Sequence, residues 1–86
     1  MKMLTKEIVK ITAENMLIEH GCMTSLEVKK RLREQNYFAI QADVSAYLDQ
    51  LAREEGWSYT DNGKFRIYQF ETNLNKLLLG LSFSVN

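Results

Sequence analysis

Apolar side chains recur every three or four residues in three stretches of the chain, the spacing that places them on one face of an α-helix. The predicted helices span residues 5–20, 24–35 and 41–54. The second carries Val28 and Leu32 four residues apart, and the third carries Val44, Leu48 and Leu51. The first has a wide apolar arc that predicts packing on two sides; its members are Ile8, Val9, Ile11, Ala13, Met16, Leu17 and Ile18.

Residues with known capping preferences stand at the ends of these stretches. Thr5 precedes the first helix as an N-cap, and Gly21 follows it as a C-terminal cap. Thr24 and Glu27 have the three-residue spacing of a capping box, which predicts the start of the second helix. Asn36 stands where that helix should end, and Asn readily adopts the left-handed backbone conformation found there.

A β-hairpin is predicted over residues 57–68, where two short aromatic-rich runs flank Asn62-Gly63. Asn-Gly favours a type I′ turn, with positive φ at both central residues. The resulting two-residue loop would pair Thr60 with Phe65 and Tyr59 with Arg66. Both faces of the hairpin carry bulky apolar groups, so the sequence leaves open which face meets the core. Residues 21–24 are expected to pair with the hairpin as a short strand.

Helix, short strand, helix, helix and hairpin is the element order of a winged helix-turn-helix, with the hairpin as the wing. We therefore expect a small α+β domain over residues 1–86. The segment 70–86 is apolar, which predicts either a strap that covers the core or a dimer contact. Its leucines at helical spacing are Leu74, Leu77, Leu78 and Leu81.

Composition limits the classes of function. The 86 residues carry 11 basic and 11 acidic side chains, whereas dedicated nucleic-acid binders usually have a basic excess. No apolar run approaches the roughly 18 residues of a membrane span, and the first residues lack the apolar stretch of a signal peptide. The single cysteine, Cys22, cannot form an internal disulfide, so we expect a cytoplasmic protein.

The sequence offers little for catalysis. There is one histidine, and no Gly-rich phosphate loop, nucleophile elbow or paired-carboxylate motif is present. His20 and Cys22 lie close together, but the chain has no further histidine or cysteine to complete a zinc site. We expect a protein that is not an enzyme and that holds no metal or cofactor.

The stretch from Thr24 to Tyr68 resembles the N-terminal DNA-binding domain of bacterial arginine repressors. That family has a Gln-x-x-Val-Ser-Arg run in its recognition helix, and Gln41, Val44 and Ser45 match it. The chain differs at Ala46, where the family has the arginine able to bond guanine. It differs again at Ile40, the N-cap position, where the family tends to have a hydroxyl or amide side chain. The resemblance implies DNA binding and carries no expectation of arginine sensing.

Transcription regulation through double-stranded DNA is the first function predicted. Base-edge candidates on the third helix are Gln41, Ala42, Ser45, Ala46 and Gln50. Candidates for phosphate contacts are Lys29, Lys30, Arg33, Lys64 and Arg66. The third helix also carries four carboxylates, which phosphates would repel: Asp43, Asp49, Glu54 and Glu55.

The alternative prediction is a winged helix that serves as a protein–protein interaction module without sequence-specific DNA binding. Zero net charge, the acidic third helix and the aromatic cluster of Trp57, Tyr59 and Tyr68 all favour this use, because aromatic anchors dominate protein interfaces. Tyr59 and the four leucines of residues 70–86 are the predicted partner or homodimer contacts.

Overall fold

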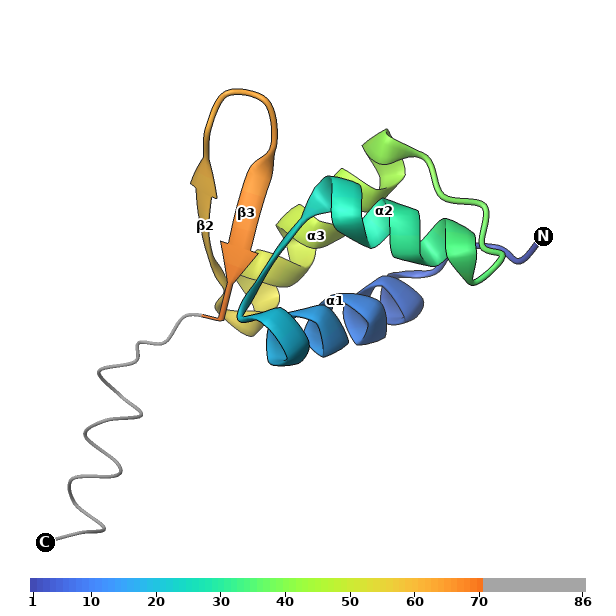
Figure 1. The fold of residues 1–86 in the computed structure, drawn as a ribbon, viewed down its shortest axis with the longest axis horizontal. Coiled ribbons are helices and arrows are strands. Elements are labelled where there is room, and N and C mark those ends of the chain that lie inside the picture. The colour runs from blue at the N-terminus through green and yellow to red at the C-terminus, as the bar shows by residue number, and fades with distance from the viewer. Residues whose placement is uncertain (71–86) are drawn as a thin grey trace, which may run out of the picture.

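A computed structural model describes residues 1–70, and the predictions made for residues 71–86 lie outside it. Residues 1–70 form three helices and a three-stranded antiparallel sheet with strand order β1-β3-β2 (Figure 1). The α+β class and the predicted order of elements are confirmed. The elements are α1 (Lys6–His20), β1 (Cys22–Thr24), α2 (Ser25–Glu34), α3 (Gln41–Glu55), β2 (Ser58–Asp61) and β3 (Arg66–Gln69).

The predicted caps are formed. The Thr5 hydroxyl accepts the Ile8 N–H at 3.2 Å at the start of α1, and Gly21 ends that helix with φ of 82°. The capping box of α2 is complete: Thr24 Oγ1 accepts the Glu27 N–H at 3.1 Å, and Glu27 Oε1 accepts the Thr24 N–H at 2.9 Å. Asn36 is left-handed, with φ of 71°. These local signals explain why the helix limits were predictable.

The hairpin register differs from the prediction. β2 and β3 pair Asp61 with Arg66 and Tyr59 with Tyr68, so the connecting loop has four residues, 62–65. Gly63 has a positive φ but Asn62 does not, which excludes the type I′ turn. The Asn62 side chain instead accepts the N–H groups of residues 64 and 65, at 2.9 and 3.0 Å. This side-chain turn competes successfully with the backbone turn that Asn-Gly usually forms.

The exposures of the hairpin residues show which face of the hairpin meets the core. Each residue of β2 lies opposite a residue two positions further along β3 than predicted, so every side chain keeps its predicted face. Tyr68 is 1% exposed and Trp57 is 6% exposed, whereas Tyr59 on the same face is 51% exposed. The face that carries the aromatic residues is therefore the core face, with its outer edge open to solvent.

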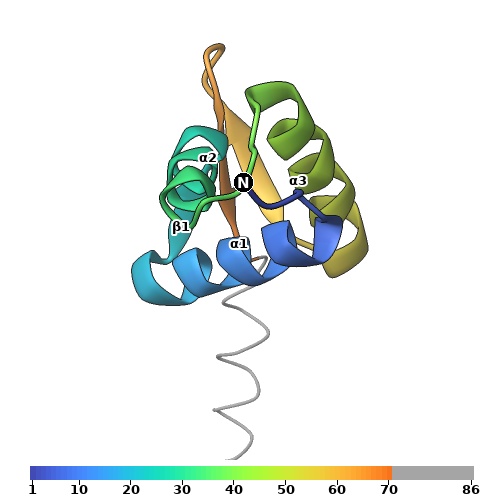
Figure 2. The same ribbon diagram turned by 90° about the vertical axis from the view of Figure 1, so that its right-hand side faces the viewer.

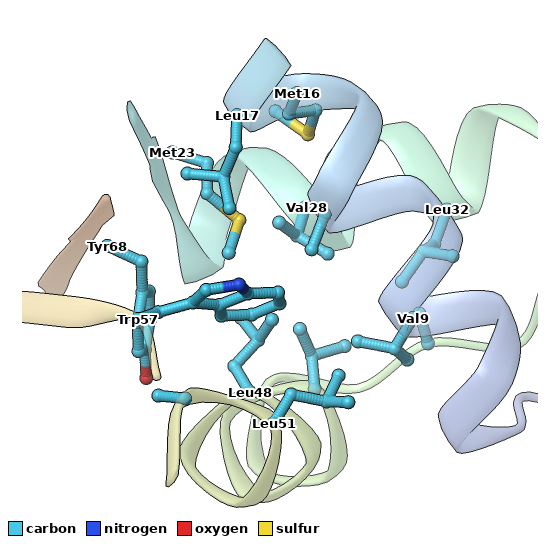
Figure 3. Close-up of a cluster of buried hydrophobic side chains, with 14 residues drawn as sticks. Val9, Met16, Leu17, Met23, Val28, Leu32, Leu48, Leu51, Trp57 and Tyr68 are labelled. Carbon is cyan, nitrogen blue, oxygen red and sulfur yellow. The ribbon is translucent and has the colours of Figure 1, made fainter. Parts of the chain in front are cut away.

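The core lies where the three helices meet this face of the sheet. The Trp57 ring projects into the middle of the cluster, between Met23 of β1 and Leu48 of α3 (Figure 3). Val28 and Leu32 of α2 are fully buried, as the apolar stripe of that helix predicts. Truncating a fully buried leucine such as Leu48 to alanine would cost about 2 to 5 kcal/mol of folding free energy.

The expectation that the first helix packs on two sides is wrong within residues 1–70. Val9, Ala13, Met16 and Leu17 are buried, but Ile11 is 49% exposed and Ile18 is 72% exposed. α1 contacts α2, α3 and β1, and its buried residues form one arc to which Ile11 and Ile18 do not belong.

The arrangement separates two ends of the molecule. In Figure 2 the tip of the wing and the first turn of α3 project at one end, and α1 lies across the other. The N-terminal segment is fastened beside the turn after α2, because the N–H of Lys2 donates to the carbonyl of Asn36 at 2.8 Å. Within residues 1–70, none of the helices combines the length and apolar character needed to cross a bilayer.

Candidate nucleic-acid interface

A polar groove lies between α3, the start of α2 and the wing. Its volume is about 360 Å³, and seven polar side chains line it: Ser25, Gln41, Ser45, Asp49, Asp61, Lys64 and Arg66. Four of the ten residues predicted to contact DNA line the groove: Gln41 and Ser45 from α3, and Lys64 and Arg66 from the wing. The structure also shows that several of these side chains bind one another.

Gln41 joins the start of α3 to the start of α2. Its Nε2 donates to Ser25 Oγ at 2.8 Å and to Ser45 Oγ at 3.2 Å. Its Oε1 is buried and has no hydrogen-bond partner within residues 1–70. Gln41 is therefore committed to internal contacts, whereas the sequence suggested a free amide that could pair with adenine.

Arg66 holds the wing against α3. Its Nη1 donates to Asp49 Oδ1, which also accepts the hydroxyl of Tyr68 at 2.9 Å. The Nε of Arg66 lies 3.6 Å from Asp61 Oδ2, and the guanidinium stacks over the Tyr59 ring at 4.6 Å from its centroid. Because two carboxylates neutralise its charge and an aromatic ring covers it, the Arg66 guanidinium is poorly placed to bind phosphates.

The Tyr68 hydroxyl belongs to the same network. Burial, together with its hydrogen bond to Asp49, raises the pKa of Tyr68 to about 12. Tyr68 therefore stays a hydrogen-bond donor to Asp49 throughout the neutral range. Its ring packs at 5.9 Å from Tyr59 and at 6.4 Å from Trp57, measured between centroids. We call Asp49, Tyr59, Arg66 and Tyr68 the wing anchor.

Most of the carboxylates of α3 have cationic partners. Asp49 pairs with Arg66, Glu54 with Lys6 at 2.5 Å and Glu55 with Lys10 at 3.3 Å. The bond from Lys6 lowers the pKa of Glu54, as expected for a carboxylate held beside an ammonium group. Asp43 forms no ion pair within residues 1–70. The repulsion that four carboxylates would exert on phosphates is thus much reduced.

The solvent-facing ridge of α3 is short and largely uncharged in its first two turns. Ala42, Ala46 and Gln50 are exposed, as a helix that buries Val44 and Leu48 requires. Gln50 donates to Glu54 at 3.1 Å through an exposed bond. Arg53, also exposed, stands on the same ridge in the last turn and is not among the contacts predicted from the sequence. Helical spacing alone, seven residues from Ala46, would have found it.

The basic residues of α2 divide between two sides of that helix. Ser25, Lys29 and Arg33 are four residues apart and form one row. Ser25 contacts Gln41, and Arg33 Nε donates to the Ala39 carbonyl at 2.8 Å, so this row borders α3. Lys30 instead lines a shallow depression with His20 and Arg31, beside α1. Lys29 therefore lies near the predicted interface and Lys30 lies away from it.

The remaining predicted contacts differ in how far they are exposed, and some lie outside the described residues. Lys64 is exposed in the wing loop. Tyr59, the predicted partner contact, is half exposed but carries the Arg66 guanidinium on its ring. The predicted dimer contacts Leu74, Leu77, Leu78 and Leu81 lie outside the described residues. Within residues 1–70, no cluster of three or more His, Cys, Asp or Glu side chains is arranged to hold a metal ion.

Comparison with protein families, with curated proteins and with solved structures finds no match for this chain.

Proposed function

We propose that this protein is a small winged-helix regulator that binds double-stranded DNA through α3 and the wing. The observation that carries the proposal is the exposed ridge of α3, whose first turn projects at the same end of the molecule as the wing tip, while most α3 carboxylates are paired. A helix that projects beside a hairpin matches the dimensions of a major groove, about 12 Å wide.

In this arrangement the two alanines of the α3 ridge face base edges and the surrounding cations face phosphates. Lys29 lies beside the start of α3, and Lys64 lies on the wing, so the two would contact the backbone on either side of the groove. The first turn of α3 adds main-chain N–H groups, because Ile40 provides no side-chain cap for them. The resemblance to arginine repressor DNA-binding domains supports the same orientation.

The proposed affinity is modest. Arg66 is held by the wing anchor, and Arg33 donates to a main-chain carbonyl, so few cations remain for phosphates. With two to four phosphate contacts, log K should fall with log salt at a slope of roughly −2 to −4. A single module of this kind would gain much by pairing on adjacent half-sites.

Two neighbouring lysines provide the test. We expect Lys29→Glu to weaken binding to a fluorescently labelled random duplex by about ten-fold at low salt and to flatten the salt dependence. Lys30→Glu makes the same change of charge one residue away, on the α1 side, and should have a clearly smaller effect. Equal effects of the two substitutions, or no binding by the unaltered protein, would contradict the proposed interface.

A second candidate function is a protein-interaction module, and a separate surface favours it. Ile11 and Ile18 stand seven residues apart on the outer side of α1 and are exposed, so α1 offers an apolar strip at the end opposite the wing. Ile18→Asp would remove this strip without touching α3. If the protein acts through a protein partner at α1, this change should abolish partner capture and leave DNA affinity unaltered.

A further inference from the structure

Few side chains in the first three turns of α3 remain available to DNA once those that are bonded within the protein are set aside. Gln41 is bonded to two serines, and Asp49 is bonded to Arg66 and Tyr68. Among the exposed side chains of the first three turns, Ala42, Ala46 and Gln50 form the ridge, with Asp43 at its side. None of these four carries a positive charge.

This composition disfavours guanine. Arginine or lysine bound to guanine O6 and N7 is the commonest specific contact in the major groove. The basic residue on this ridge, Arg53, lies eleven residues after Ala42. That is about 16 Å further along the helix axis. The guanidinium of Arg66 is held against Asp49 and over the Tyr59 ring. The first turns of α3 therefore lack the chemistry that selects G·C pairs.

The same ridge suits thymine. An exposed alanine methyl makes apolar contact with the C5-methyl group of thymine, and glutamine can pair with adenine N6 and N7. Ala42 and Ala46 are one turn apart, about 6 Å along the helix axis. That separation corresponds to roughly two base steps of about 3.4 Å each. Two small side chains also allow the helix to approach the groove floor closely.

We propose, on the basis of the proposed DNA-binding function, that α3 selects A·T-rich sites by apolar contact of Ala42 and Ala46 with thymine methyl groups. Gln50, in the next turn, is the adenine-reading side chain. Its exposed bond to Glu54 is readily exchanged for bonds to a base. The protein then gains specificity mainly from shape and apolar contact, which is consistent with its lack of net charge.

Replacing thymine with deoxyuracil tests this directly, because the change removes the C5-methyl group and leaves every base-pairing atom in place. We would measure binding to an alternating A·T duplex and to its deoxyuracil counterpart at the same low salt. Burial of each methyl contributes about a four-fold change in affinity, so loss of two contacts should weaken binding by roughly fifteen-fold. The Ala46→Ser variant should show a smaller difference between the two duplexes. Cys22→Ser, an exposed change on β1, should keep the full difference.

The outcomes separate the inference from the function that it rests on. Equal affinity for the thymine and deoxyuracil duplexes, with binding still sensitive to Lys29→Glu, would overturn thymine recognition and leave the DNA-binding proposal in place. A preference for G·C duplexes would also overturn it. Absence of binding to every duplex at low salt would overturn both proposals together.

Discussion

The carboxylate of Asp49 accepts hydrogen bonds from two residues of β3, Arg66 and Tyr68. In the sequence this residue is only a negative charge on a helix expected to face phosphates. In the structure it fastens the wing to α3 and uses up the charge of Arg66. The Asp49–Arg66 pair therefore neutralises a carboxylate that would repel phosphates. It also occupies an arginine that was predicted to contact them.

Asp49→Asn tests this role with almost no change of shape. The amide still fits the site but cannot neutralise Arg66, so we expect a loss of about 1 kcal/mol in the free energy of unfolding. Urea denaturation would measure it. The matched control is Asp43→Asn, on the same helix and without an ion pair within residues 1–70, which should change stability by less than about 0.5 kcal/mol. Equal effects would argue against the wing anchor.

The Tyr68 hydroxyl predicts how stability depends on alkaline pH. The pKa of Tyr68 is raised from 10.0 to about 12 in the folded protein. Between these values the folded state holds a proton that the unfolded state has lost. Its contribution to stability is therefore complete below the ordinary pKa and falls as pH rises towards the folded-state value. Tyr68→Phe should remove that part of the alkaline decline and cost about 1 kcal/mol at neutral pH. Tyr59→Phe, at a half-exposed ring, serves as the control, and an unchanged decline in Tyr68→Phe would contradict the assignment.

At the scale of elements, α3 begins without a side-chain cap. Ile40 has an extended backbone, with φ of −111° and ψ of 151°, which suits an N-cap, but its side chain cannot accept a hydrogen bond. Ile40 is 41% exposed, so replacing it gives up only part of the burial of a core isoleucine. We expect Ile40→Ser to raise the free energy of unfolding by about 0.5 to 1 kcal/mol. Thr24→Ala, which removes a cap that is present, should lower it by about 1 kcal/mol. A destabilised Ile40→Ser protein would show that the isoleucine packs more tightly than its exposure indicates.

The helices were predictable from sequence because their signals are local. The capping box of Thr24 and Glu27, the left-handed Asn36 and the apolar stripe of α2 each depend on residues within one or two turns. The hairpin register was not, because two turn types compete at Asn62 and the winner depends on side-chain hydrogen bonds. The internal contacts of Gln41 and Arg66 join residues 16 and 17 positions apart, beyond the reach of any local pattern.

At the scale of the whole molecule, a chain without net charge need not present a neutral interface. Lys6 and Lys10 neutralise Glu54 and Glu55 at the α1 end of α3, away from the wing tip. Lys29 and Lys64 remain beside the exposed ridge, where Asp43 is the carboxylate without an ion pair within residues 1–70. The sequence gives the total charge, and only the fold shows how ion pairs distribute it.

Amide NMR of the labelled protein, titrated with a random duplex at low salt, would show directly whether DNA binds at the α3 and wing end. We expect shifts to concentrate in residues 41–50, in the wing loop 62–65 and around Lys29, and to weaken as salt increases. The outer side of α1, around Ile11 and Ile18, should stay unperturbed. Shifts confined to α1, or no shifts at any salt concentration, would contradict the claim.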